Sequence, residues 1–445
     1  MKNENNIIDK YLFIFFLVLI IFLPFETKKA YFSFKYFIFT NIETALYLFL
    51  TFWILYRSFQ RRVVLPPLRV IVVLALFVFM LLLSAYSAPE YRFNAFKGSS
   101  RFITGILLFF ASYDLFRTRS RIHAFMIVFV AGGVIISILG LMEVFQIGNI
   151  HKWLHRTFEY NLIVAGTLPR ASSTLMYPNT LAMYLEMVIP LLLGLLIFHS
   201  SQTLRIVFYG SFAVIFYAII LTYSRAGLIT VFLLLAIFGF FGKYLKLHSS
   251  QRTFATICIL GAAILLFHYL SQPSLLTRWS PDYFSHHDLT TPWATEGTDL
   301  PRTEMWEIAF RMMKKHPLLG IGVDNFRLLH GSYLNDIGLW DSNHASHNLF
   351  VEILVSAGIL GAMPFVIFIF MWFHSMLKRI LNMNNVKNCQ IALALFLSVL
   401  SVLIHGIVDY FLWRTVIYCM FWITLGASWR YILLTEPENK YDYRA

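Results

Sequence analysis

A histidine between two polar residues stands at the entrance to a long apolar segment. Ser346, His347 and Asn348 open the run HNLFVEILVSAGILGAMPFVIFIFMWF, and about 75 mostly polar residues precede it. Ser346 is a residue type that favours the N-cap of a helix, so we expect His347 in the first helical turn. The positive end of the helix dipole disfavours an imidazolium there, which would keep the ring neutral, as a general base requires. A histidine that only caps the helix at the membrane surface fits the same position.

His344 and His347 also form an H-x-x-H pair, a spacing that could hold a metal ion. No carboxylate pattern accompanies the pair, and the chain has no zinc-type spacing of cysteines, no Walker loop and no Asp-x-Asp pair. We therefore expect neither a metal nor another cofactor. A large membrane protein without a nucleotide site is then either a transporter or an enzyme whose activated substrate is carried by a lipid.

Two arginines have side chains suited to holding a phosphate. Arg225 lies between two apolar segments, where its planar guanidinium could face a phosphate or simply reach the membrane surface. Arg302 stands at the start of a predicted helix, whose N-terminus would attract an anion; a solvated surface position is the alternative. Secondary candidates, most of which could instead pair locally at the membrane surface, are Arg170, Asn179, His344, Asn348, Asp409 and Arg414.

The composition is that of a polytopic membrane protein. Of 445 residues, 58% are hydrophobic and only 13% are charged, whereas about 25% are charged in soluble proteins. A charge that faces lipid costs several kcal/mol, which explains the shortfall and makes the intramembrane Glu186 a functional candidate. We expect an all-α bundle of about twelve transmembrane helices, at 11–26, 35–56, 68–87, 102–116, 123–146, 178–198, 205–222, 226–242, 254–271, 348–377, 388–408 and 411–431.

Basic residues indicate that both termini are cytoplasmic. With the N-terminus inside, the inner segments contain 19 lysines and arginines and the short outer segments contain 11. The first apolar run has no small-residue cleavage site after it, so we expect it to remain as the first span. The 11 basic residues on the outer side suggest a bound anion, with lipid headgroups as the alternative partner.

One long outer loop is expected late in the chain. In it, a helix near 301–315 carries an apolar stripe formed by Met305, Ile308, Ala309 and Met312. His316-Pro317 ends this helix, and the segment from Gly320 to Gly322 is a predicted turn. The expected organisation is 1–271 with helices one to nine, 272–346 as the loop domain, 347–434 with helices ten to twelve, and 435–445 as a cytoplasmic tail.

Several short motifs follow one another in order along 165–415. His347-Asn348 is followed after nine residues by Gly358 and then by Gly361. Three further motifs are TYSRAG from Thr222, RTEMW from Arg302 with HPLLGIG from His316, and STLMYPNTLA from Ser173. In this order the motifs resemble the O-antigen ligase/polymerase superfamily of bacterial inner membranes. The first five spans resemble that family only in general character.

The resemblance implies a glycosyltransferase that acts at the periplasmic face. Members of the family take a glycan from undecaprenyl diphosphate; ligases pass it to a sugar hydroxyl of the lipid A–core oligosaccharide, and polymerases pass it to another carrier-linked repeat. The implied fold is a helical bundle like that of GT-C lipid-carrier glycosyltransferases, and the implied reaction inverts the sugar carbon without a metal. By motif, His347 matches the general base, and Arg225 and Arg302 match the arginines that hold the donor diphosphate.

The late position of the long loop favours an O-antigen ligase of lipopolysaccharide biosynthesis. An O-antigen polymerase shares the donor and the chemistry, and no clear sequence feature separates the two. A related oligosaccharyltransferase is a further alternative. A transporter of carrier-linked glycans is a different class and would favour ionisable groups along a path through the membrane, where mainly Glu186 is found. No nucleic-acid partner is expected.

Overall fold

The structure is a computed structural model that describes most of the chain. It describes residues 7–27, 29, 31–34, 37–160, 162–165, 168–198, 201–241, 261, 302–333, 345–411 and 414–435. The expected span at 254–271, apart from residue 261, lies outside the described residues, and so do His344 and the tail beyond residue 435. The loop expected at 272–346 is described only at 302–333 and 345–346.

Helices make up nearly all of the described secondary structure. They are α1 (Ile7–Phe22), α2 (Asn41–Gln60), α3 (Leu68–Ser87), α4 (Arg92–Leu115), α5 (Arg119–Val144), α6 (Ile150–Phe158), α7 (Pro178–Phe198), α8 (Gln202–Leu221), α9 (Arg225–Phe240), α13 (Arg302–Lys315), α14 (Phe326–Leu329), α15 (Leu349–Leu381), α16 (Val386–His405) and α17 (Thr415–Leu434). Two small antiparallel hairpins join β1 (Phe32–Phe34) to β2 (Phe37–Phe39) and β3 (Val164–Ala165) to β4 (Leu168–Pro169).

Eight of the described helices are long and apolar enough to cross a membrane, which confirms a polytopic all-α membrane protein. They are α1, α3, α5, α7, α8, α15, α16 and α17. Helices also form at the expected spans that correspond to α2, α4 and α9, but α9 is shorter and the other two do not meet the same measure of length and apolarity. The expected number of twelve spans therefore stays a prediction.

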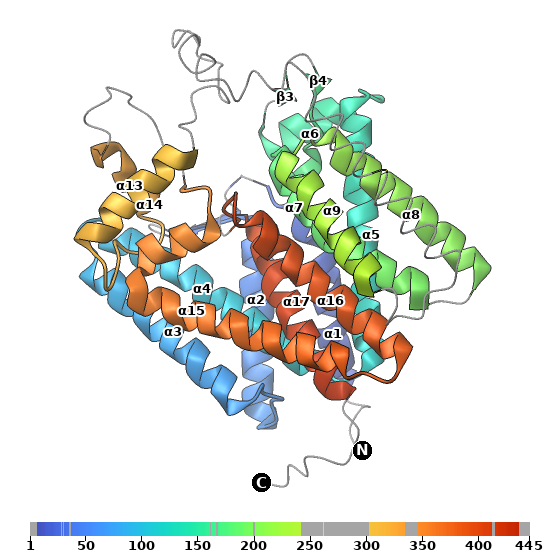
Figure 1. The fold of residues 1–445 in the computed structure, drawn as a ribbon, viewed down its shortest axis with the longest axis horizontal. Coiled ribbons are helices and arrows are strands. Elements are labelled where there is room, and N and C mark those ends of the chain that lie inside the picture. Colours follow the sequence, from blue (N-terminus) through green and yellow to red (C-terminus); the bar gives the residue numbers. More distant parts are fainter. Residues whose placement is uncertain are drawn as a thin grey trace.

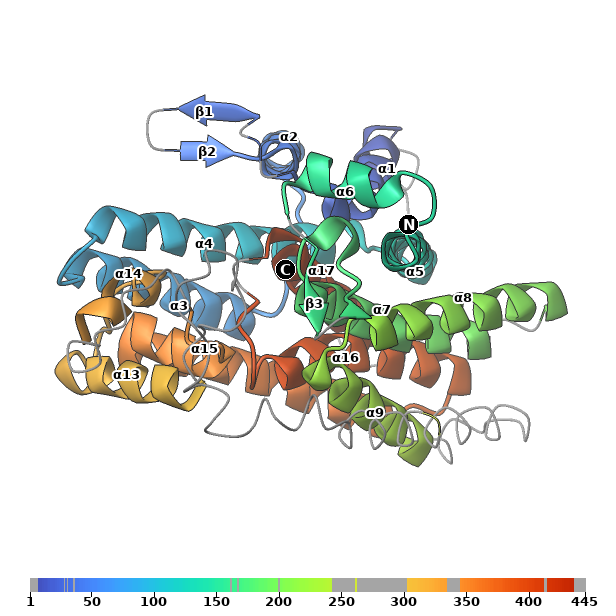
Figure 2. The ribbon, with the colours of Figure 1, turned by 90° about the horizontal axis from the view of Figure 1, so that it is seen from above.

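The helices form two groups that meet along central helices. In Figure 1, α3, α4 and α15 run side by side at one edge with α13 and α14 next to them, and α5, α7, α8 and α9 form the other edge. The view from above in Figure 2 separates the same two groups and places α17 between them. The most extensive contacts are those of α16 with α7, α17 with α4, and α15 with α3. α16 and α17 therefore tie the two groups together.

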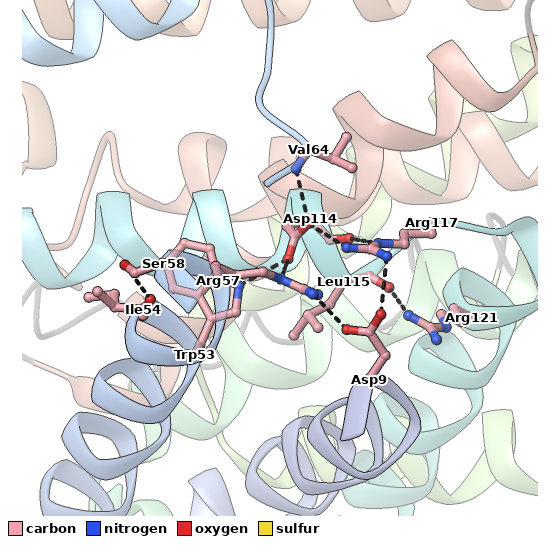
Figure 3. Close-up of polar contacts among 10 residues, drawn as sticks. All are labelled: Asp9, Trp53, Ile54, Arg57, Ser58, Val64, Asp114, Leu115, Arg117 and Arg121. Atoms are coloured by element: carbon pink, nitrogen blue, oxygen red, sulfur yellow. Dashed lines mark hydrogen bonds and ion pairs between the residues drawn. The ribbon is translucent and has the colours of Figure 1, made fainter. Parts of the chain in front are cut away.

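A buried network of ion pairs ties four segments together at one end of the bundle (Figure 3). Arg57 of α2 bonds to Asp9 of α1 at 2.6 Å and to Asp114 of α4. Arg117, which follows α4, bonds to the same two carboxylates at 3.2 and 3.1 Å. Arg57 and Asp114 are almost completely buried, so each charge is compensated by the others rather than by water. We call these four residues the latch.

Two short amphipathic helices, α6 and α13, lie in segments between the long helices. α13 buries the stripe of Met305, Ile308, Ala309 and Met312, and ends before His316. α6 lies between α5 and the β3–β4 hairpin. Residues 150–158 and 302–315 thus form helices with one buried apolar side each.

α15 is not one continuous helix, because Gly358 interrupts it. Its φ of +64° and ψ of −174° lie outside the helical region. Residues of the turn after α13 enter the break: Ile321 and Gly322 donate to the carbonyls of Val355 and Ser356, and Ile359 donates to the carbonyl of Pro317. A Cβ on Gly358 would collide with the backbone of Leu318 and Leu319. The continuous helix expected over 348–377 is therefore wrong, because a loop segment takes over the broken backbone bonds.

Candidate functional site

His347 lies just outside α15 and not in its first turn. Asn348 is the N-cap, and its Oδ1 accepts from the backbone N–H groups of Phe350 and Val351 at 2.9 and 3.0 Å. Ser346 does not cap the helix, because its hydroxyl donates to the carbonyl of Asn348. His347 has a φ of +49°, a left-handed conformation that is unusual for a residue other than glycine. The expectation that Ser346 caps the helix is therefore wrong by two residues.

The start of α15 is fixed to the turn that follows α16. The backbone N–H of Leu349 donates to the carbonyl of Gly406 at 2.7 Å, and Nδ2 of Asn348 donates to the carbonyl of Ile407 at 2.7 Å. Both ends of the amide of Asn348, a secondary candidate, therefore hold the start of α15. This clamp brings His347 next to residues of the α16–α17 turn.

Asp409 of that turn is the partner of His347. Nδ1 of His347 lies 3.3 Å from Oδ1 of Asp409, which also accepts from the backbone N–H of Tyr410 at 2.7 Å. The two side chains are 30% and 16% exposed, so the pair lies at the surface of the protein without being fully solvated. A carboxylate on Nδ1 fixes the imidazole tautomer and its orientation, and leaves Nε2 as the ring nitrogen that can accept a proton.

Electrostatics keep Asp409 in its ionised form. Burial acts to raise the pKa of Asp409, but its hydrogen bond with His347 and the positive charge of that ring outweigh burial. The charges of His405 and Arg302 act in the same direction, so the pKa of Asp409 lies well below its ordinary value. Asp409 is therefore a carboxylate at neutral pH.

Asn179 and Arg170 extend the pair of His347 and Asp409 into a chain of polar contacts. Asn179, in the first turn of α7, donates through Nδ2 to Oδ2 of Asp409 at 3.4 Å. Its Oδ1 accepts from Nη2 of Arg170 at 3.2 Å, and Nε of Arg170 donates to the carbonyl of Thr222 at 2.8 Å. We call Arg170, Asn179, Asp409 and His347 the polar chain. It joins three loops and the start of a helix that are far apart in the sequence.

The turn before α9 presents Arg225 at the first position of that helix. Ser224 is the N-cap and accepts from the backbone N–H of Gly227 at 3.3 Å, and Tyr223 has a left-handed φ of +50°. Thr222, the residue bonded by Arg170, accepts through Oγ1 from the N–H of Ser224 at 3.2 Å. The turn is thus joined to the polar chain through Thr222.

Arg302 and Arg414 occupy different positions relative to the polar chain. Arg302 is exposed at the start of α13, and its charge acts on Asp409 and His405. Arg414, directly before α17, stacks on the ring of Tyr177 with 3.9 Å between its guanidinium carbon and the ring centroid. His344 lies outside the described residues. Within the described ranges, no three histidine, cysteine, aspartate or glutamate side chains gather as metal ligands would.

Sequence reasoning did not find the residues that support Ser346. Glu352, in the first turn of α15, accepts from the backbone N–H of Ser346 at 2.9 Å, and Trp306 of α13 donates through Nε1 to its carbonyl at 3.0 Å. Trp306 belongs to the RTEMW motif of the sequence. A glutamate four residues after an N-cap was the available signal for such a contact.

Comparison with known proteins gives one family. The model of the family described as O-Antigen ligase matches residues 210–366, a segment that contains Arg225, Arg302, His347 and Gly358. No curated protein matches the chain. Arg170, Asn179 and Asp409 of the polar chain lie beyond the matched segment. Residues 210–366 are therefore similar to the O-antigen ligase family, and this match supports membership of the chain in the O-antigen ligase/polymerase superfamily.

Proposed function

We propose that the protein is an O-antigen ligase. It transfers a glycan from undecaprenyl diphosphate to a sugar hydroxyl of the lipid A–core oligosaccharide, at the periplasmic face of the bacterial inner membrane. The observation that carries the proposal is the contact between His347 and Asp409, because it orients a base at the start of α15 within the segment that is similar to the O-antigen ligase family. The family match itself fits a ligase or a polymerase equally.

In the proposed reaction, Nε2 of His347 accepts the proton of the acceptor hydroxyl. The hydroxyl oxygen forms a bond to the anomeric carbon while the bond from that carbon to the carrier diphosphate breaks. One displacement of this kind inverts the anomeric centre and needs no covalent enzyme intermediate. Asp409 stabilises the imidazolium that forms, because it remains a carboxylate. This role requires His347 to be reachable, and its ring is 30% exposed.

The leaving diphosphate gains negative charge, which needs fixed positive charge nearby. Arg225 and Arg302 are the proposed donors, since each is the first residue of a helix, where the backbone N–H groups also favour an anion. The charge of Arg302 acts on Asp409, which supports a place for α13 on the same side as His347. Arg170 has a supporting role instead, because it bonds Thr222 and Asn179.

A polymerase or a related oligosaccharyltransferase would use the same arrangement of residues with a different acceptor. The test must therefore identify the acceptor. Deletion of the gene in its host, followed by electrophoresis of the lipopolysaccharide, separates the outcomes. A ligase predicts core without O-antigen together with long polymer left on the carrier. Core with a single repeat would identify a polymerase, and a normal ladder would rule out both.

The roles of individual residues can be tested with purified protein in vesicles. With carrier-linked glycan as donor and lipid A–core as acceptor, His347→Ala should abolish transfer while the donor still binds. Arg225→Ala and Arg302→Ala should instead weaken donor binding. Full transfer by His347→Ala would remove its role as the base. Transfer that survives EDTA would support a reaction without a metal.

A further inference from the structure

A second pair of histidine and carboxylate lies within the bundle, close to the polar chain. Glu186 is in α7, and His405 is the last residue of α16. Nδ1 of His405 lies 2.9 and 3.1 Å from the two carboxylate oxygens of Glu186. Glu186 is completely buried and His405 is 1% exposed. Two ionisable groups are thus held together among apolar helices.

The buried pair is connected to the polar chain on both sides. Glu186 follows Asn179 by seven residues on α7, so the two lie on the same face of the helix, about 10 Å apart along its axis. On the other side, the carbonyl of His405 accepts from the backbone N–H of Asp409 at 3.1 Å. α7 and the end of α16 therefore meet through two polar contacts, Asn179 with Asp409 and Glu186 with His405.

A glycine brings α9 against the same carboxylate. A Cβ on Gly227 would lie 2.9 Å from Cβ of Ala182 and 3.1 Å from Oε1 of Glu186. Only a residue without a side chain allows α9 to approach α7 this closely, and Arg225 is two residues before that glycine. The segments that present Asn179, Arg225 and Asp409 thus all converge around Glu186.

Stability alone does not account for this pair. Apolar residues of similar volume commonly stabilise a core as well as a buried ion pair does. Nε2 of His405 is buried and has no hydrogen-bond partner among the described residues, which adds a further cost. The charged groups that act on His405 are Glu186, Asp409 and Arg302, and those that act on Glu186 are His405 and Asp409. The nearest charges outside the pair therefore belong to the candidate site.

We propose that Glu186 and His405 are positioning residues for glycan transfer, an inference that rests on the proposed function. Their contact holds α7 against the end of α16, so that Asn179 and Asp409 meet and Asp409 keeps its bond to His347. His405 is the member of the pair that is joined to Asp409 through the backbone.

The test compares Glu186→Gln/His405→Gln with Ser398→Ala in vesicles. The double variant removes both ionisable groups and can keep an amide hydrogen bond. Ser398→Ala is the matched control, because Ser398 of α16 donates to the carbonyl of Met187 of α7 at 2.7 Å and is likewise buried. We expect kcat of the double variant to fall by about 10-fold or more with the donor KM unchanged. We expect kcat of Ser398→Ala to stay at the wild-type value.

The pH profile distinguishes positioning from a general loss of packing. In the double variant Asp409 no longer holds its bond to His347, so the imidazole loses the carboxylate that favours its protonated form. The acid limb of the kcat profile should therefore move to lower pH in the double variant. Should that variant fail to fold, Glu186→Gln alone tests the same shift, because it removes the carboxylate that contacts Nδ1 of His405. The profile of Ser398→Ala should match that of the wild type.

The outcomes separate this inference from the proposed function. A folded pair variant with the kcat and pH profile of Ser398→Ala would overturn the positioning role and leave the glycosyltransferase proposal intact. Wild-type protein that transfers no glycan to any acceptor would overturn the proposed function, and the inference with it.

Discussion

His347 depends on its neighbours for both conformation and orientation. Its left-handed backbone costs about 1–3 kcal/mol unless the surroundings compensate for it. The compensation comes from the clamp of Asn348 and Leu349 on the α16–α17 turn and from the bond to Asp409. Three other non-glycine residues near the polar chain, Ser173, Met176 and Tyr223, also have positive φ. Four of the nine described non-glycine residues with positive φ thus lie in the segments that assemble the candidate site.

Asp409→Asn should separate orientation of the base from donor binding. The amide keeps the shape of the side chain but can no longer supply a negative charge to the imidazolium. We expect kcat for glycan transfer to fall by about 100-fold or more, while the donor KM changes little. The measurement is steady-state transfer in vesicles with varied donor.

Asp324→Asn is the matched control for that variant. Asp324 pairs with Arg327 at 3.1 Å and, among the described residues, not with a member of the polar chain. Its φ of +68° is a conformation that asparagine accepts readily, so the substitution should leave the backbone unchanged. Equal losses of kcat in Asp409→Asn and Asp324→Asn would show that replacing either aspartate impairs transfer, and would remove the specific role of Asp409.

At the level of elements, the break in α15 explains the glycine of the His347-Asn348 motif. The part of α15 before Gly358 begins at the N-cap Asn348, and its last carbonyls accept hydrogen bonds from the turn between Gly320 and Gly322. That turn follows α13 directly, and α13 also contacts Ser346 through Trp306. The loop helix therefore contacts both ends of the short helical piece that begins beside His347.

Gly358→Ala should destabilise the protein more than an ordinary glycine replacement does. The new Cβ would collide with the backbone of Leu318 and Leu319, in a conformation that only glycine adopts without strain. We expect a loss of about 3 kcal/mol or more, read as a lower Tm in detergent. Gly210→Ala in α8 is the control, since nothing lies within 4 Å of its Cβ, and helix propensity predicts a gain of about 0.5–1 kcal/mol. A Tm of Gly358→Ala equal to that of Gly210→Ala would contradict the account of the break.

Elements with local patterns could be predicted, and features set by tertiary contacts could not. The stripe of Met305, Ile308, Ala309 and Met312 predicted α13 because helical periodicity is visible in one short segment. The predicted N-cap was wrong because Ser346 and Asn348 are both residue types that cap helices well. The contact of Asn348 with Ile407 and that of Ser346 with Glu352 decide between them. The break at Gly358 depends on a loop that precedes it by about 40 residues, which no local pattern reports.

At the level of the whole molecule, the latch and the polar chain are separate clusters on different segments. The latch joins α1, α2 and α4 to the segment before α5. The polar chain joins the loops around α7, α15 and α16. No residue belongs to both clusters. This separation predicts that the stability of the bundle and the chemistry of the site can be changed independently.

Asp114→Asn should cost stability without affecting catalysis. Asp114 is fully buried and accepts from Trp53, Arg57 and the backbone N–H of Val64, so its loss leaves buried donors without their carboxylate. We expect a loss of about 3–5 kcal/mol, measured as Tm in detergent, and an unchanged kcat per folded molecule. Glu307→Gln removes the exposed pair with Arg311 and should cost less than about 1 kcal/mol. A loss of kcat in folded Asp114→Asn would show that the two clusters are coupled.

The members of the candidate site were predicted better than its connections. His347, Arg170, Asn179 and Asp409 were all candidates by residue type and position near the ends of apolar segments. Their contacts join residues up to 230 positions apart, and a single sequence contains no signal for such pairings. Glu186 was suspected because it is an acid within a span, whereas its partner His405 was not found, since a histidine at the end of an apolar run is unremarkable by itself.

The connection of His347 to the α16–α17 turn has a consequence for biosynthesis. A ribosome delivers this chain to the membrane from its N-terminal end, so the histidine enters before the turn that contains Asp409. Until the last hairpin is inserted, the imidazole lacks the carboxylate that orients it, and Asn179 lacks its partner as well. Under the proposed function, the nascent chain should therefore be inactive until the last hairpin is in place, and a chain truncated before the turn should lack an oriented base even with all earlier helices inserted.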